Sequence, residues 1–217
     1  MRAFALCLAL LCPSPAQPCD VALVLAIDVS GSIDAGEYAI QSAGTAAALQ
    51  DPAVAAALLA GQAALAVLHW SGQGQQAVVL PWTRMRSPQH ITDAATHIRT
   101  TPRAFAGSDT AVGQAIDASL ALFAQVPECK RKIIDISGDG PENSGNTARA
   151  ARSRANAAGV AINAIAIEDL GQSTAITQFY RNWIITPGGF VMTSRGLAAY
   201  PQAIRQKLLR ELEKPAS

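Results

Sequence analysis

Short apolar runs alternate with longer amphipathic segments along the chain. Runs rich in β-branched residues or leucine predict six strands, at Val21–Ile27, Ala64–Trp70, Ala77–Leu80, Lys132–Ser137, Val160–Ile167 and Phe190–Met192. Between them, apolar residues three and four apart predict helices, at Ala35–Gln50, Pro88–Thr100, Ala111–Ala124, Thr147–Ala158 and Thr174–Asn182. A last helix carries a single apolar stripe, formed by Leu197, Tyr200, Ile204, Leu208 and Leu212.

The Ala-rich run from Ala53 to Leu68 is broken by Gly61 and Gln62, which indicates a helix, a turn and then a strand. Strands that alternate with helices in this way are typical of an α/β fold. We predict a doubly wound, mostly parallel sheet of about six strands with helices on both faces. A chain of 217 residues is long enough for one such domain, which we assign to residues 19–214.

The first residues follow the pattern of a secretory signal. Arg2 precedes an apolar core at Ala3–Leu11, which is too short to span a bilayer, and Ser14-Pro15-Ala16 resembles a cleavage site. We therefore expect residues 1–16 to be a cleaved signal peptide and the protein to be periplasmic or secreted.

A lipid anchor is not expected, because the modified cysteine of a lipoprotein needs a small residue before it. Here Leu11 precedes Cys12 and Pro18 precedes Cys19. We expect no membrane anchor after signal cleavage.

Charge argues against nucleic acid as a partner. The chain has 17 Lys and Arg against 16 Asp and Glu, and removal of Arg2 with the signal leaves 16 of each. A formally neutral protein offers no broad basic surface to phosphates or anionic lipids. The short basic stretch Lys130–Lys132 is interpreted as the solvated start of a strand.

Oxygen-bearing side chains gather where predicted strands end or helices begin. The first strand runs into Asp28, Ser30 and Ser32, which form D-x-S-x-S. The fourth strand, in "KIIDISGDG", leads to Asp139, and "GSDTAVGQAI" places Thr110 directly before a helix. In an open α/β sheet, ligands bind at the carboxyl ends of the strands.

Two carboxylates and three hydroxyls, with no cysteine or histidine nearby in the sequence, form a hard oxygen donor set. Such a set suits Mg²⁺ or Mn²⁺ rather than zinc. Magnesium usually keeps some water ligands, so an incoming carboxylate from a partner has a position to fill. The alternative is that these residues serve only as turn and helix-capping residues.

These motifs resemble the metal-ion-dependent adhesion site of the von Willebrand factor A (vWA) domain. That pattern is D-x-S-x-S, a threonine before a central helix and an aspartate after the fourth strand, which here correspond to Asp28, Ser30, Ser32, Thr110 and Asp139. The stretches "DVSGSIDAGEY", "PWTR" and "IDISGDGPENSG" are most similar to a group of exported bacterial proteins that carry this domain alone and have no assigned function.

The resemblance spans the chain beyond the signal and implies metal-dependent binding of an acidic group on a protein partner, without catalysis. Asp109 and Ser108 stand where the family pattern commonly has glycines, so Asp109 is a candidate extra carboxylate near the metal. Asn143 is a candidate hydrogen-bonding support for the ligands, although asparagine in "PENSG" also suits a turn.

The resemblance also makes the first and fourth strands parallel neighbours. Cys19 and Cys129 then meet at the amino-terminal end of the sheet, because they lie nine and ten residues before Asp28 and Asp139. In an exported protein this pair is expected to form a disulfide. Two separate buried thiols are the alternative.

A metal-dependent phosphohydrolase is the main competing function, since strand-end aspartates such as Asp28 and Asp139 also suit phosphoryl chemistry. Ser30 stands where a common aspartyl-phosphate pattern has another acid, and no general base is evident. A dinucleotide-binding domain is disfavoured because "DVSGSID" lacks G-x-G-x-x-G. Asp135, between two isoleucines, is expected to have a structural role, paired with an arginine or with backbone amides.

Overall fold

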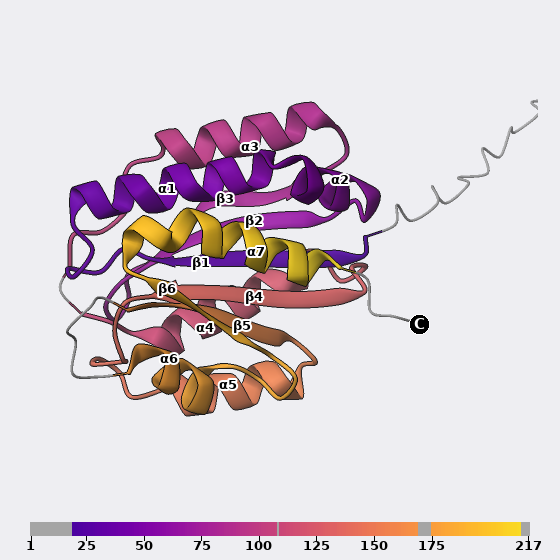
Figure 1. The fold of residues 1–217 in the computed structure, drawn as a ribbon. Helices are drawn as coiled ribbons and strands as arrows, with labels where there is room; N and C mark the ends of the chain where they lie inside the picture. Colours follow the sequence, from indigo (N-terminus) through magenta and orange to yellow (C-terminus); the bar gives the residue numbers. More distant parts are fainter. Residues whose placement is uncertain (1–18, 108, 169–174, 214–217) are drawn as a thin grey trace, which may run out of the picture.

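The computed structural model describes residues 19–107, 109–168 and 175–213. Within them a six-stranded sheet has the order β3-β2-β1-β4-β5-β6 (Figure 1). Its strands are β1 (Val21–Asp28), β2 (Ala64–Trp70), β3 (Gln76–Arg84), β4 (Arg131–Gly138), β5 (Ala161–Glu168) and β6 (Val191–Arg195). The α-helices are α1 (Ala35–Gln50), α2 (Pro52–Ala60), α3 (Pro88–Thr100), α4 (Val112–Leu122), α5 (Ala148–Ala157), α6 (Ile176–Phe179) and α7 (Tyr200–Leu212). Three shorter helical turns are η1 (Phe123–Gln125), η2 (Tyr180–Ile184, a π-helix) and η3 (Leu197–Ala199).

Helices cover both faces of the sheet, as predicted. Helices α1, α2, α3 and α7 pack on one face, and α4, α5, α6 and η2 pack on the other (Figure 1). All strand pairs are parallel except β2 with β3. The carboxyl ends of the parallel strands therefore share one edge of the sheet, at the left of Figure 1.

Strand β1 shows why the sheet is central. All eight of its residues are buried, and alternate side chains enter opposite cores. Leu23, Leu25 and Ile27 face α1 and α7, whereas Val24 and Ala26 face α4. A strand buried on both faces consists of a continuous apolar run. The sequence pattern therefore predicted the bounds of β1 to within one residue.

The edge strand β3 is longer than predicted. The prediction ended it at Leu80, before a proline, but the strand continues to Arg84. Its pairing with β2 is irregular between Leu65 and Leu68, opposite the segment that contains Pro81. A proline is tolerated in an edge strand at a bulge, because its missing N–H removes no regular ladder bond.

Asp135 has a structural partner, as predicted. The prediction that this partner is an arginine or a backbone amide was wrong, because it is a lysine. Its carboxylate lies 2.6 Å from Nζ of Lys207 on α7, and Lys207 also pairs with Glu211 at 2.5 Å. All three side chains are buried. Burial, and next the repulsion from Glu211, raise the pKa of Asp135 to about 8. A shared proton thus relieves the excess of two carboxylates over one ammonium.

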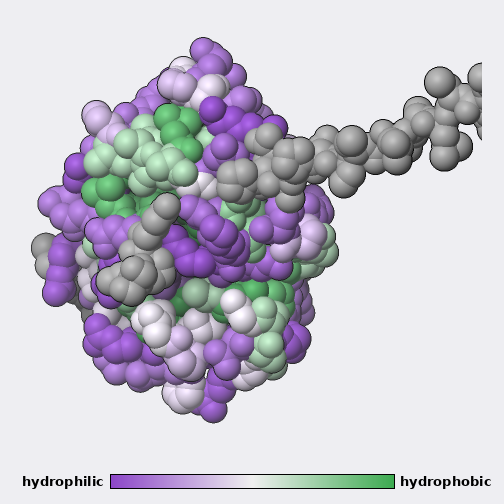
Figure 2. Space-filling model, turned by 90° about the vertical axis from the view of Figure 1, so that its right-hand side faces the viewer, coloured by the Kyte–Doolittle hydropathy of each residue, from purple (hydrophilic) through white to green (hydrophobic). Residues whose placement is uncertain are grey.

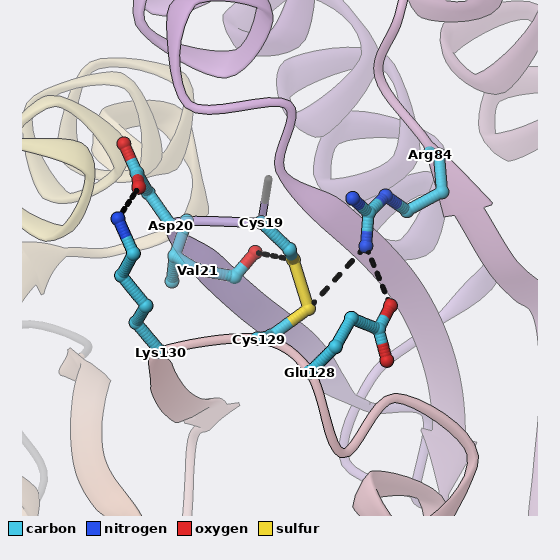
Figure 3. Close-up of a disulfide and its surroundings, with 7 residues drawn as sticks. All are labelled: Cys19, Asp20, Val21, Arg84, Glu128, Cys129 and Lys130. Carbon is cyan, nitrogen blue, oxygen red and sulfur yellow. Dashed lines mark hydrogen bonds and ion pairs between the residues drawn. A yellow bond between two sulfur atoms is a disulfide. The ribbon is translucent and has the colours of Figure 1, made fainter. Parts of the chain in front are cut away.

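The expected disulfide between Cys19 and Cys129 is present. It joins the chain just before β1 to the chain just before β4, and its Cα atoms are 4.5 Å apart (Figure 3). Lys130 and Asp20 form an ion pair beside it at 2.9 Å. The bond fixes the end of the sheet opposite to Asp28.

The end of the molecule that carries the disulfide has hydrophobic patches among hydrophilic areas (Figure 2). A groove of about 480 Å³ lies there between α2 and α3, lined by apolar residues that include Pro52, Leu59 and Ile91. No single helix in the described ranges is long and apolar enough to cross a membrane; only α1 and α2 together, bent by 65°, meet a test of length and composition. The predicted signal at residues 1–16 lies outside the described residues.

Candidate metal centre

Asp28 is a fully buried member of the candidate site, as is Ser30. Asp28 ends β1, and its side chain is fully excluded from solvent. Oδ1 accepts a hydrogen bond from the backbone N–H of Ser30 at 2.8 Å. Oδ2 is buried and has no hydrogen-bond partner within the described residues. A buried carboxylate oxygen without a partner is costly, so this atom points to a missing cation or proton.

A chain of hydroxyls connects the loop after β1 to Asp139. Ser30 Oγ lies 3.2 Å from Ser32 Oγ, and Ser32 Oγ donates to Asp139 Oδ1 at 2.8 Å. The loop closes with a hydrogen bond from Ile33 N to Ser30 O at 3.0 Å. Because β1 and β4 are neighbours, residues about 110 positions apart meet directly.

A capping box starts helix α1 directly after this loop. Asp34 Oδ1 accepts from Glu37 N, and Glu37 Oε2 accepts from Asp34 N, each at 2.8 Å. The cap fixes where the loop ends, which limits the positions open to Ser30 and Ser32.

Thr110 is held at the same edge through its backbone. Its N–H donates to Asn143 Oδ1 at 2.8 Å, and its carbonyl accepts from Asn143 N at 3.0 Å. Thr110 is 4% exposed, and Ala111 N donates to Ser71 O at 2.9 Å. No hydrogen bond in the described part of the chain joins the Thr110 hydroxyl to Asp28 or Asp139. Asn143 therefore supports the threonine loop.

Asp109 lies on the outer side of the threonine loop. Its carbonyl accepts from Ser71 Oγ at 3.1 Å, and its side chain lies against Gly72. Asp109 as an extra carboxylate near the metal stays a prediction.

Glu142 was missed by the sequence reasoning. Its Oε1 accepts from Gly113 N at 2.9 Å and its Oε2 accepts from Ala148 N at 3.0 Å. These N–H groups belong to the first turns of α4 and α5, where a carboxylate is favourable. Glu142 thereby joins the loop after β4 to the helix that follows Thr110. An acidic residue directly before Asn143, which also suits a turn, gives no local sign of this bridge.

Tyr180 is a second residue that sequence reasoning missed. Its hydroxyl, buried on η2, has no hydrogen-bond partner within the described residues. A Cβ added to Gly138 would overlap this hydroxyl and come within 2.9 Å of Asp28 Oδ2. Because Gly138 has no side chain, the Tyr180 hydroxyl and Asp28 Oδ2 can both occupy the space beside it. Tyr180 follows Asp28 by 152 positions, so no local motif connects them.

The electrostatics favour a cation at this position. Burial, with a further contribution from the Asp139 carboxylate, raises the pKa of Asp28 to about 7, although hydrogen bonds from Ser30 oppose the rise. Burial and the same two carboxylates hold the pKa of Tyr180 well above its usual range. A divalent cation would stabilise the ionised carboxylates, and the carboxylate and hydroxyl donors fit a hard metal.

Nitrogen and sulfur ligands are not gathered here. Within residues 19–107, 109–168 and 175–213, no three His, Cys, Asp or Glu side chains are arranged to hold a metal. His69 packs edge-on against Tyr38, with ring centroids 5.5 Å apart, and burial lowers its pKa to about 4. A metal at this edge would therefore depend on the serine and threonine hydroxyls as well as on Asp28 and Asp139.

A family model described as "Protein of unknown function (DUF1194)" matches residues 18–216. The chain belongs to this family. The match covers nearly the whole chain and extends from just before Cys19 to beyond α7. A comparison with curated proteins gives no significant match.

Solved structures show that this DUF1194 protein has the vWA fold. Proximal thread matrix protein 1 from the mussel byssus, with a zinc-occupied MIDAS motif, aligns with a TM-score of 0.67 and 20% identity, over 91% of this chain and 49% of that one. A von Willebrand factor type A protein from Catenulispora acidiphila aligns with a TM-score of 0.67 and 20% identity, over 89% and 43%. The vWF domain of the pilus tip protein Mfa5 from Porphyromonas gingivalis aligns with 0.62 and 12%, over 93% and 99%. The chain thus spans about half of the mussel protein.

Proposed function

We propose that this DUF1194 protein is an exported, non-enzymatic binding module that captures an acidic group of a partner protein through a divalent metal. The metal would be held by Asp28, Ser30, Ser32, Thr110 and Asp139. The observation that carries the proposal is the fully buried Asp28 carboxylate, whose Oδ2 has no partner in the described residues and whose ionisation is resisted by Asp139.

The candidate ligands differ in charge. Asp28 and Asp139 would supply negative charge, and the hydroxyls of Ser30, Ser32 and Thr110 would supply neutral donors. Asn143 and Glu142 hold the Thr110 loop and the two helix ends in place. Tyr180 lies behind Asp28 and keeps that side of the site closed to bulk water. When bound, the metal would supply an electrophilic position for a carboxylate of the partner.

Mg²⁺ or Mn²⁺ is the metal we propose, because all the donors are oxygens. The mussel protein holds zinc in its MIDAS motif, the metal-ion-dependent adhesion site, which supports the binding of a divalent ion by a protein of this fold. Zinc therefore belongs among the ions to be tested.

An oxidising compartment is supported by the Cys19–Cys129 disulfide, since such bonds persist mainly in exported proteins. The solved structures of similar fold include a pilus adhesin, SpaC from Lactobacillus rhamnosus GG, and the pilus tip protein Mfa5. These similarities support extracellular or periplasmic protein binding as the role to test.

The phosphohydrolase alternative gains no specific support from the site. His69 on β2 lies opposite Ile27 of β1 but packs edge-on against Tyr38, and burial lowers its pKa. In the described residues no other histidine lies among the site residues. The binding role therefore fits the groups that are present better.

Isothermal titration of Mg²⁺, Mn²⁺ and Zn²⁺ into chelator-stripped protein tests the proposal. We expect saturable binding of one Mg²⁺ or Mn²⁺ that is lost in Asp28→Ala. Asp93→Ala, which removes an exposed carboxylate on α3, is the matched control and should bind normally. Equal binding by the two variants, or no binding by a folded wild type, would contradict the proposal.

A further inference from the structure

A basic and aromatic surface lies beside the candidate metal centre, between α5 and η2. Two adjoining hollows form it, with volumes of about 280 and 320 Å³. The smaller is lined by Glu142, Asn146, Ala148, Arg149, Phe179 and Trp183. The larger is lined by Arg149, Arg152, Ser153, Asn156, Trp183 and Pro187. Arg149 and Trp183 border both hollows, and we call the whole the Arg–Trp surface.

Arg149 and Trp183 form its centre. The guanidinium carbon of Arg149 lies 3.5 Å from the centroid of the Trp183 ring. Trp183 is 37% exposed, which is unusual for so large an apolar side chain in this protein. Tryptophan and arginine dominate the energetics of protein interfaces. A stacked guanidinium also keeps the N–H donors at its edge available for a carboxylate.

The charge of this surface is positive. No ion pair within the described residues links Arg149 or Arg152 to a carboxylate, and Arg152 donates to the carbonyl of Asn182 at 3.0 Å. Glu142 is the acidic residue of the lining, but both of its oxygens accept backbone N–H groups at the ends of α4 and α5. In the described part of the chain, the exposed Arg149 and the half-buried Arg152 therefore have no neutralising carboxylate, and they lie beside an exposed aromatic ring.

Two segments of the chain connect the Arg–Trp surface to the candidate metal centre. The loop that begins at Asp139 passes through Glu142 and Asn146, which line the smaller hollow, and leads into Arg149 on α5. The π-helical turn η2 carries Tyr180, next to Asp28, and three residues later Trp183. The two sites therefore share the loop after β4 and the turn η2.

We propose that the Arg–Trp surface binds an acidic peptide segment of the partner protein, with one carboxylate on Arg149 and Arg152 and an adjacent apolar side chain against Trp183. The inference rests on the proposed function, because the same partner would present its other carboxylate to the metal. Charge complementarity selects this occupant: the surface pairs two unneutralised guanidinium groups with an apolar ring. The Arg–Trp surface then adds affinity and sets the direction in which the partner lies.

The test uses metal-free, isotope-labelled protein and NMR. The probes are an amidated hexapeptide of sequence Glu-Leu-Glu-Glu-Leu-Glu and its counterpart with Gln in place of every Glu. We expect the acidic peptide to shift the indole N–H signal of Trp183 saturably, and the Gln peptide to leave it in place. Arg149→Glu should weaken this binding at least about tenfold, as expected for an interface hot spot.

The matched control is Arg99→Glu, which makes the same charge change at an exposed position of α3 on the opposite face of the sheet. It should bind the peptide as the wild type does. Arg149→Gln serves as a second variant if Arg149→Glu fails to fold. Binding that survives both Arg149 variants, or equal binding of the Gln peptide, would overturn the proposal. Tripolyphosphate that shifts Trp183 when the acidic peptide does not would overturn it in favour of a phosphorylated ligand.

The two proposals fail independently. Asp28→Ala, which should lose metal binding in calorimetry, should keep the peptide-induced shift of Trp183. Loss of metal binding in the wild type with retained peptide binding would contradict the proposed function alone. Retained metal binding with no saturable peptide shift would overturn the Arg–Trp inference alone.

Discussion

Replacement of Asp28 by Asn should stabilise the metal-free protein while it destroys the metal site. Asn has nearly the same shape, so its Oδ1 can still accept from Ser30 N. Its Nδ2 would replace the unpartnered Oδ2 and face the Tyr180 hydroxyl, which can accept a hydrogen bond. The variant removes a buried negative charge and leaves the packing in place.

The magnitude follows from the pKa of Asp28. Burial and Asp139 raise it from 3.8 to about 7. At about 1.4 kcal/mol per pH unit, this difference costs the metal-free fold up to about 4 kcal/mol. The contribution of Asp28 to stability is fully present below about pH 4, where both states are protonated, and is lost as the pH rises through about 7. We expect Asp28→Asn to gain about 2–4 kcal/mol at pH 8 and nearly nothing at pH 4.

Urea unfolding followed by circular dichroism, with chelator present, measures this difference at each pH. Excess Mg²⁺ should stabilise the wild type and leave Asp28→Asn unchanged, because a ligand that binds only the native state stabilises it by mass action. A variant less stable than the wild type in chelator at pH 8 would refute the reasoning. That result would mean that the ionised Asp28 already has a stabilising partner without metal.

Four further outcomes are expected. Gly138→Ala should weaken Mg²⁺ binding in calorimetry by about 10- to 100-fold, because the added methyl group displaces the Tyr180 hydroxyl and Asp28 Oδ2. An unchanged affinity for Mg²⁺ would contradict this. Apparent Mg²⁺ affinity should fall by about tenfold per pH unit below pH 7 and level off above it, because protons compete for Asp28; a flat profile would contradict this. Lys207→Met should lower the free energy of unfolding by about 3–5 kcal/mol, because it leaves the buried carboxylates of Asp135 and Glu211 without a cation. An unchanged free energy of unfolding in urea would contradict this. The double variant Cys19→Ala/Cys129→Ala should lose on the order of 4 kcal/mol in the same assay and keep metal binding; loss of metal binding in a folded double variant would contradict this.

The centre of the sheet was predictable because strands such as β1 and β2 are buried on both faces. Continuous apolar runs such as Val21–Ile27 have few alternative structures, and the polar residues that follow them mark the carboxyl edge. The prediction of β3 was too short because Pro81 is a strong local stop signal. Only the position of β3 at the edge of the sheet, with its irregular pairing to β2, makes a proline acceptable there.

Asn143 was predicted as a hydrogen-bonding support from its place in the loop after the fourth strand. Other groups around the site and in the core were not predictable, because they act across long sequence separations. Tyr180 reaches Asp28 only through the packing of η2, and Glu142 bridges two helix ends that meet only in the fold. Lys207 occurs on a helix with ordinary amphipathic spacing, and its burial beside Asp135 depends on how α7 lies on the sheet. Motif spacing assigns the candidate ligands, and tertiary packing selects the groups around them.

The most direct test of the central claim is a crystal structure of the protein soaked in Mn²⁺, with anomalous data collected to locate the metal. The account predicts one strong anomalous peak among the oxygens of Asp28, Ser30, Ser32, Thr110 and Asp139, absent from crystals of Asp28→Asn. A peak elsewhere, or no peak at this edge of the sheet in well-ordered wild-type crystals, would contradict it.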